Sequence, residues 1–196
     1  MASVCSRWAD GWKATSEGRR RLRQVAFDFP QDLLDTESLS MAVIPERRHR
    51  LAVRSGSTVS ILDRHMRSGT SFELPTSYGD IAASEHGDIT SFYVTDLYNN
   101  EVRCLTRYGT EVASYEDQEK LISCPTLAPG ELLFCVLSDE DEYTLDEIIA
   151  LDAQTMQPRY RFGLSLLTDV RGMVVVGEEL FVCDKGNDRL QVFSLA

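Results

Sequence analysis

Carboxylate and amide side chains recur at one spacing in two stretches of the chain that start eighty-eight residues apart. The two sets are Asp96, Asn99 and Asn100, and Asp184, Asn187 and Asp188. Oxygen-bearing side chains of this kind could contact a ligand directly. They could equally build tight corners, because Asn tolerates left-handed backbone and both residue types bond nearby backbone amides. The equal offsets favour corners, since a unique active site would not repeat.

Other residue types that carry chemistry are scattered. The three histidines are His49, His65 and His86. They fall in or beside expected turns and share no metal-ligand spacing. The sequence also has no nucleophile elbow, no HExxH pair and no Gly-rich phosphate loop. These observations disfavour a hydrolase or a nucleotide-binding enzyme.

The five cysteines form no CxxC pair, so neither a zinc site nor a disulfide framework is indicated. We expect Cys104, Cys135 and Cys183 to be small buried hydrophobes within strands. The acidic segment SDEDEYTLDE (138–147) offers oxygen ligands that would suit calcium. It lacks the Gly-centred calcium-loop pattern, so we expect a solvated loop, with no metal and no cofactor.

The elements that must position these residues are repeated strands. Each copy reads as an apolar run ending in Asp, a polar turn with Asn, and a second apolar alternation, which is typical of two antiparallel strands joined by a corner. The valines at the centre of each second strand are Val53, Val94, Val136 and Val182, spaced by 41, 42 and 46 residues. A period of about 40 to 45 residues with four strands per unit indicates a propeller blade.

Four such units occupy about 38–75, 80–117, 121–163 and 171–196. The sequence therefore predicts an all-β fold, a β-propeller of four-stranded antiparallel blades forming a partial or incomplete ring of about four blades. The last unit has three strands and no fourth. The segment 23–30, RQVAFDFP, could pair with Arg189–Leu195 as the missing outer strand, which would place the propeller at 23–196 behind a basic tail at 1–22.

Charge is distributed unevenly. Residues 1–54 hold ten Lys and Arg against seven acids, and the remaining residues hold ten against twenty-four, so the net charge is +3 for the first part and −14 for the second. An acidic repeat body repels phosphate backbones, which disfavours nucleic acid as a partner.

Composition indicates a soluble, folded protein, because 43% of the 196 residues are hydrophobic and no run approaches the roughly 20 apolar residues of a membrane helix. The first thirty residues lack the apolar core of a secretory signal, so we expect a cytoplasmic protein. The tract Arg19–Arg23 could act in nuclear import. An organelle transit peptide is the other reading of the N-terminus, and Asp10 and Glu17 count against it.

The stretches DITSFYVTDLYNNEVRCLTRYG (88–109) and GMVVVGEELFVCDKGNDRLQVF (172–193) resemble the NHL-repeat family of β-propellers. The likeness is a Gly-led inner strand, a strand ending in Asp, an Asn-rich turn, and a strand led by Val102 or Arg189. The first and third units depart from this pattern. The resemblance covers about 160 residues, two units well and two loosely.

This resemblance implies a protein-interaction module of the six-bladed type that presents loops around one face. Aromatic and Arg residues in the corners are natural contacts for a protein partner, namely Tyr98, Tyr108, Tyr143 and Arg171. Relatives often accompany ubiquitin-ligase modules, but no RING-type Cys and His spacing is present here. A non-catalytic scaffold is therefore the favoured function.

The alternative is a metal-dependent hydrolase or lyase of the lactonase-like six-bladed class, which would need convergent ligands and a general base. The missing strand raises a separate expectation. An open blade edge invites self-association, or completion of a larger ring by another chain.

Overall fold

The structure is a computed structural model that describes residues 39–44, 50–63, 68–86, 89–128, 130–139 and 145–195, with only the backbone described at 85, 86 and 89. Several residues and segments discussed above lie outside these ranges, namely the tail 1–22, the strand 23–30, His49, His65 and Tyr143.

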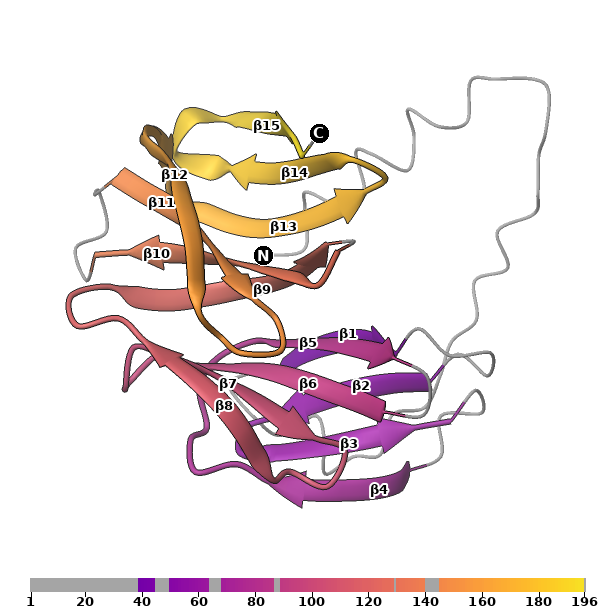
Figure 1. The fold of residues 1–196 in the computed structure, drawn as a ribbon. Coiled ribbons are helices and arrows are strands. Elements are labelled where there is room, and N and C mark those ends of the chain that lie inside the picture. Colours follow the sequence, from indigo (N-terminus) through magenta and orange to yellow (C-terminus); the bar gives the residue numbers. More distant parts are fainter. Residues whose placement is uncertain are drawn as a thin grey trace, which may run out of the picture.

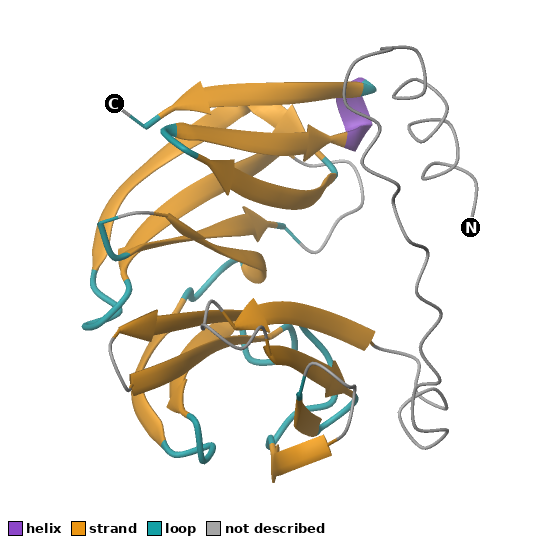
Figure 2. Cartoon of the chain, turned by 90° about the vertical axis from the view of Figure 1, so that its right-hand side faces the viewer, coloured by secondary structure: helices purple, strands orange, loops and turns teal. Residues whose placement is uncertain are grey.

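Nearly every described residue belongs to a β-strand or a turn between strands, as Figure 2 shows. The strands form four antiparallel sheets, three of four strands and one of three (Figure 1). The first sheet contains β1 (Leu39–Ile44), β2 (Arg50–Ser55), β3 (Thr58–Leu62) and β4 (Ser68–Glu73). The second contains β5 (Ile81–His86), β6 (Ile89–Asp96), β7 (Glu101–Thr106) and β8 (Glu111–Glu116).

The third sheet contains β9 (Leu121–Ala128), β10 (Leu132–Ser138), β11 (Leu145–Asp152) and β12 (Pro158–Thr168). The fourth contains β13 (Val170–Val176), β14 (Glu179–Asp184) and β15 (Arg189–Ser194), with the 3-10 turn η3 (Lys185–Asn187) between the last two strands. In every sheet the strands lie side by side in chain order.

The four valines that define the repeat lie on β2, β6, β10 and β14, and all four are buried. Each second strand has a neighbouring strand on either edge, and in the middle sheets a sheet also lies on either face. The outermost strands β4 and β8 alternate instead between exposed and half-buried residues. The register predicted from the sequence is confirmed.

The hydrophobic core is divided into three layers, one between each pair of consecutive sheets. Between the first and second sheets the side chains of Ile61 and Val59 pack with Phe92. The second layer joins Tyr93 and Cys104 to residues of β9, β10 and β11. The third joins β10 and β11 to β13 and β14, with Phe162 and Phe193 in an edge-to-face contact at 5.0 Å.

The inner strands of consecutive sheets also meet directly, β1 with β5, β5 with β9, and β9 with β13. Among the described residues, no contact of similar extent joins the first sheet to the fourth. The chain is thus a β-propeller arc of four blades, with the first two in the lower half of Figure 1 and the last two in the upper half. The predicted fold class is confirmed. None of the helical structure in the described part has the length and apolarity that crossing a membrane would require.

The third blade corrects the sequence-based prediction in two places. The segment 138–147 is not a solvated loop throughout, since β11 begins at Leu145 and the Asp146 side chain is buried. Strand β12 also continues to Thr168, beyond the predicted end of the third unit at 163, and its register with β11 shifts between Asp146 and Ile148. This irregularity includes Gly163 at φ +86° and allows Leu167 to reach the core.

Candidate functional site

The predicted corner of the second blade is built around Asp96, the last residue of β6. Its buried carboxylate accepts hydrogen bonds from the backbone N–H of Tyr98 at 3.1 Å and of Asn99 at 3.3 Å. The Asn99 Nδ2 donates to the second oxygen at 2.7 Å. Asn100 follows in the left-handed region at φ +52°, which Asn tolerates. Asp96 therefore directs its oxygens into its own corner.

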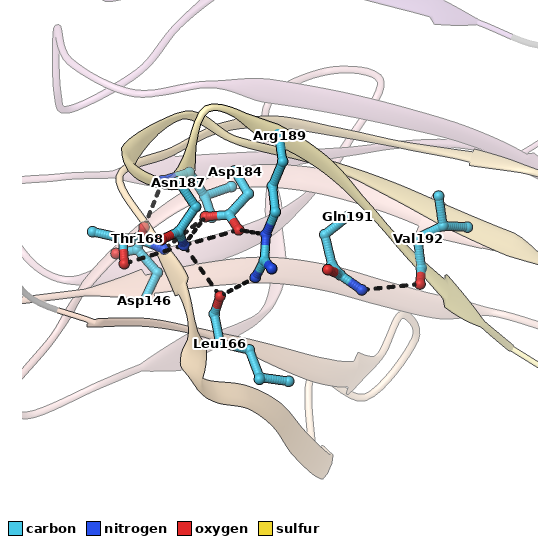
Figure 3. Close-up of polar contacts among 9 residues, drawn as sticks. Asp146, Leu166, Thr168, Asp184, Asn187, Arg189, Gln191 and Val192 are labelled. Carbon is cyan, nitrogen blue, oxygen red and sulfur yellow. Dashed lines mark hydrogen bonds and ion pairs between the residues drawn. The ribbon is translucent and has the colours of Figure 1, made fainter.

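Asp184 makes the equivalent corner of the fourth blade and also reaches the third (Figure 3). Its fully buried carboxylate accepts from the Thr168 backbone N–H at 2.9 Å, from Asn187 Nδ2 at 2.9 Å and from Arg189 Nε at 2.6 Å. Arg189 donates in turn to the Leu166 carbonyl at 2.6 Å. One carboxylate thus joins the β14–β15 corner to the end of β12.

The protonation state of Asp184 follows from these contacts. Burial raises the pKa of the carboxyl, because the charged form loses solvation. The hydrogen bonds from Thr168, Arg189 and Asn187 act in the opposite direction and outweigh burial, so its pKa lies below the ordinary value. Asp184 is an ionised structural acceptor at neutral pH.

The sequence analysis missed a buried cation, Arg54, at the end of β2. Its guanidinium is fully buried and donates to the carbonyls of Gly56 at 3.1 Å, Thr95 at 2.8 Å and Thr76 at 3.2 Å. Burial lowers the pKa of Arg54, and the nearby carboxylates of Asp80 and Asp96 partly offset this. Three carbonyls from two blades therefore converge on one side chain.

Arg54 could not be found from its own strand, where Arg in an alternating pattern reads as a solvent-facing residue. The residue in the sequence that could have indicated this close packing is Gly79, next to the predicted start of the second unit. A Cβ at Gly79 would lie 2.0 Å from the Thr95 carbonyl oxygen and 2.8 Å from the Arg54 guanidinium, at φ +140°. Only glycine allows the backbone to pass there.

The ten residues that the sequence indicates as candidates for turns or for partner contacts do not all lie at one end of the blades. The corners 97–100 and 185–188 share an end with the connections between sheets, since Thr95 N–H donates to Asp80 O at 3.1 Å and Asp117 N–H to Asn100 O at 2.9 Å. We call this end the corner face, defined by residues 56–57, 74–80, 96–100, 117–120, 169–171 and 184–188. It carries eight of the ten candidates, namely Asp96, Tyr98, Asn99, Asn100, Arg171, Asp184, Asn187 and Asp188.

Tyr108 lies in the turn between β7 and β8, at the opposite end of the second blade. Tyr143 is outside the described residues. Strand β7 separates the turns of Tyr98 and Tyr108, so the two side chains lie at opposite ends of the second blade, and their contact with a partner stays a prediction.

Among the large hydrophobic side chains on the corner face, Tyr98 is the most exposed, at 71%. Its ring contacts that of Tyr78 edge to face, with centroids 5.2 Å apart. Arg171 is exposed and pairs with Asp169 at 2.6 Å, and Lys185 pairs with the same carboxylate. Exposed aromatic and cationic side chains thus stand on corners whose buried carboxylates hold the backbone.

The cysteines are free thiols wherever the structure describes them, at Cys104, Cys124, Cys135 and Cys183. Cys104 and Cys135 are buried as predicted, whereas Cys183 is exposed, since it points from β14 to the side of the fourth sheet that no described sheet covers. Burial raises the pKa of Cys124 to about 11. In the described part of the chain, no three His, Cys, Asp or Glu side chains form a group that could hold a metal ion.

No known protein family and no curated protein matches the sequence. Solved structures do match. BamB from Moraxella catarrhalis aligns at 18% identity and a TM-score of 0.52, over 78% of this chain and 49% of that one. The Dos1 propeller aligns at 12% identity and 0.57, over 79% and 44%. BBS1N, solved in complex with ARL6DN, aligns at 12% identity and 0.60, over 79% and 50%.

At these identities the matches establish the fold alone. This chain is a β-propeller. It spans about half the length of the propellers named above, with 44% to 50% of each covered. The NHL type is not established, because no family matches.

Proposed function

We propose that the protein is a non-catalytic interaction scaffold whose corner face binds a protein partner. The observation that carries this proposal is the exposed Tyr98 ring supported by Tyr78 on a corner held by Asp96. Tyrosine contributes a large contact area and a hydroxyl with few rotatable bonds, and it is enriched among residues that dominate binding energy. A corner already fixed by hydrogen bonds loses little further freedom on binding.

Charge narrows the class of partner. Residues 55–196 carry a net charge of −14, which would slow association with acidic proteins and with nucleic acids. Arg171 and Lys185 are both paired with Asp169, so they add little free positive charge to the face. We propose a neutral or basic protein segment as the partner.

The corner chemistry supports an NHL-type assignment of the blades, since Asp96 and Asp184 occupy the same corner position and each accepts from an Asn three residues later. We extend the proposal to a cytoplasmic protein. The import tract Arg19–Arg23 and the transit-peptide alternative belong to the part of the chain that the structure does not describe.

The test compares Tyr98→Ala with Tyr108→Ala. The two tyrosines are equally exposed, at 71% and 70%, and occupy turns at opposite ends of the same blade. Proteins bound to the tagged chain in its native cells are crosslinked and identified, and the affinity of a purified partner is measured by calorimetry. Loss of a dominant aromatic contact costs about 2 kcal/mol or more, which is roughly thirtyfold in affinity.

We expect Tyr98→Ala to weaken binding by about that factor and Tyr108→Ala to leave binding unchanged. A partner that is insensitive to Tyr98→Ala, or that is lost equally in both variants, would contradict docking on the corner face.

A further inference from the structure

The two exposed tyrosines of the second blade differ in what lies over their rings. Tyr98 and Tyr108 are 71% and 70% exposed, at opposite ends of the blade. The guanidinium carbon of Arg107 lies over the Tyr108 ring, 5.4 Å from its centroid. In the part of the chain that the structure describes, no Lys or Arg side chain lies over Tyr98. Of these two rings, that of Tyr98 is therefore the one open to a cation from another molecule.

The contact between Arg107 and Tyr108 shows what an exposed tyrosine ring contributes in this protein. The Arg107 Nε is buried and has no hydrogen-bond partner among the described residues. The face of an aromatic ring carries partial negative charge, and it attracts a guanidinium placed within about 6 Å of its centroid. The Tyr108 ring thus gives Arg107 an electrostatic partner where the Nε has no acceptor.

The Tyr98 ring is held in place but not covered. It contacts the Tyr78 ring edge to face, with centroids 5.2 Å apart and ring planes at 86°. One neighbouring ring in this arrangement covers at most one of the two faces of Tyr98, so another face stays open, in keeping with the 71% exposure. Asp96 holds the backbone through the Tyr98 N–H at 3.1 Å. A ring positioned in advance loses little freedom when it binds.

The charges beside this corner favour a cation. The connection 116–120 lies against the corner, because the Asp117 N–H donates to a carbonyl of the corner at 2.9 Å. On this connection Glu116 and Glu119 are exposed, and neither side chain has an ion-pair partner among the described residues. Two free carboxylates against the ammonium of Lys120 leave the surroundings of the corner acidic.

We infer that the Tyr98 ring binds an arginine side chain of the partner segment through a cation–π contact. A guanidinium suits the ring better than an ammonium, because it is planar, lies flat on an aromatic face and is less strongly hydrated. A stacked guanidinium also keeps its N–H groups available to carboxylates at its rim. This inference rests on the proposed function, because the same ring is the proposed contact on the corner face.

Nuclear magnetic resonance titration of the purified full chain with short peptides tests this inference. The probe is an acetylated, amidated peptide of three Gly-Ser-Arg repeats, used at near-physiological ionic strength to screen long-range attraction. Its two counterparts replace arginine with citrulline, which has the same shape but no charge, or with lysine. We expect the arginine peptide to shift the signals of the Tyr98 ring and of residues 97–100, the lysine peptide to bind more weakly, and the citrulline peptide to bind least.

Three variants separate the ring face from the hydroxyl and from bulk. Tyr98→Leu keeps an apolar side chain without a ring, and it should weaken binding of the arginine peptide by about two- to fivefold. Tyr98→Phe keeps the ring face and should bind the peptide as the wild type does. Tyr108→Leu is the matched control, since that ring is equally exposed and already carries Arg107, and it should leave the affinity unchanged.

Four outcomes would overturn the inference. These are a citrulline peptide that binds as tightly as the arginine peptide, a lysine peptide that binds more tightly, a Tyr98→Phe variant as weak as Tyr98→Leu, and shifts that lie away from the corner of Tyr98.

The proposed function and this inference can fail separately. If the protein partner is lost with Tyr98→Ala but binds Tyr98→Leu as it binds wild type, docking on the corner face stands and the arginine contact is wrong. If the partner is insensitive to Tyr98→Ala while the arginine peptide still shifts the Tyr98 signals, the arginine contact stands and docking of that partner on the corner face is wrong.

Discussion

Removing the Asp184 carboxylate should destabilise the junction between the third and fourth blades. The Asp184→Ala variant takes the acceptor from the Thr168 backbone N–H, from Asn187 Nδ2 and from Arg189 Nε. Thr168 ends β12 in the third blade and Asn187 belongs to η3 in the fourth. The variant therefore removes an acceptor that both blades share. Alanine offers no acceptor in exchange.

The expected cost can be summed from these three bonds. A neutral hydrogen bond contributes about 1 kcal/mol, which applies to Thr168 and to Asn187. The bond from Arg189 is charge-assisted, but the Arg189 side chain is 45% exposed and can be solvated after the mutation, so we count it at about 1 kcal/mol as well. The total is about 3 kcal/mol, or roughly 6 to 12 °C in Tm for a chain of this size.

Urea unfolding followed by circular dichroism measures this loss. Asp184→Asn keeps the shape and one acceptor oxygen, and should cost about 1 to 2 kcal/mol. Asp188→Asn is the matched control, because it removes the same charge from an exposed neighbour at φ +49°, where Asn is tolerated. If the free energies of unfolding of Asp184→Ala and Asp188→Asn differ by less than about 1 kcal/mol, the Asp184 carboxylate does not hold the two blades together as the geometry indicates.

Four further predictions concern the pH dependence of Asp184 and the residues Gly79, Arg54 and Cys183. The pKa of Asp184 is lower in the folded protein than its value of about 3.9 in the unfolded chain, so its ionised form stabilises the fold above that pH, and this stabilisation is lost as the pH falls through the folded-state pKa. The difference in free energy of unfolding between wild type and Asp184→Asn should therefore shrink below about pH 4. Gly79→Ala should cost about 2 kcal/mol or more in urea unfolding, because its Cβ would meet the Thr95 carbonyl, and wild-type stability would refute this. Arg54→Lys should cost about 3 kcal/mol, since an ammonium cannot reproduce the guanidinium fork to three carbonyls, and a neutral result would show that charge alone suffices. In the native protein at pH 8, iodoacetamide should modify Cys183 before any other described cysteine, as peptide mass mapping would show, and equal rates would contradict the burial of the others.

The repeat itself was predictable from the sequence because it depends on short-range patterns. Strand β6 ends at Asp96, where the apolar alternation meets Asp and two Asn residues, and β14 ends at Asp184 for the same reason. The period of the buried valines places the second strands without any knowledge of what packs on them. The sheet count, the strand order and the three strands described in the last sheet all agree with that period.

What could not be predicted depends on contacts between distant segments. The buried Arg54 donates to the carbonyls of Thr76, in the connection to the next blade, and of Thr95, in that blade, and neither residue is near it in sequence. Asp146 was assigned to a solvated loop because acidic residues surround it, yet its carboxylate accepts from the Val170 backbone N–H at 2.6 Å. The strand pattern predicts a core position for Cys183 because it does not reveal that no described sheet covers one side of the last sheet.

The blades use different residues to hold their corners and to join one blade to the next. In register with Asp96 and Asp184, the first and third blades carry Ser55 and Ser138, which have no carboxylate to offer. The first blade is joined to the second through Arg54, and the third is joined to the fourth through Asp146.

These two junctions therefore each have a buried charged group, although its sign, its position and its partners differ. These groups are occupied in holding the backbone, and replacing them should lower stability before it changes any binding preference. The proposed binding of a partner would depend on the side chains that the corners leave exposed, so Tyr98, and not Asp96, is the residue to mutate in a binding assay.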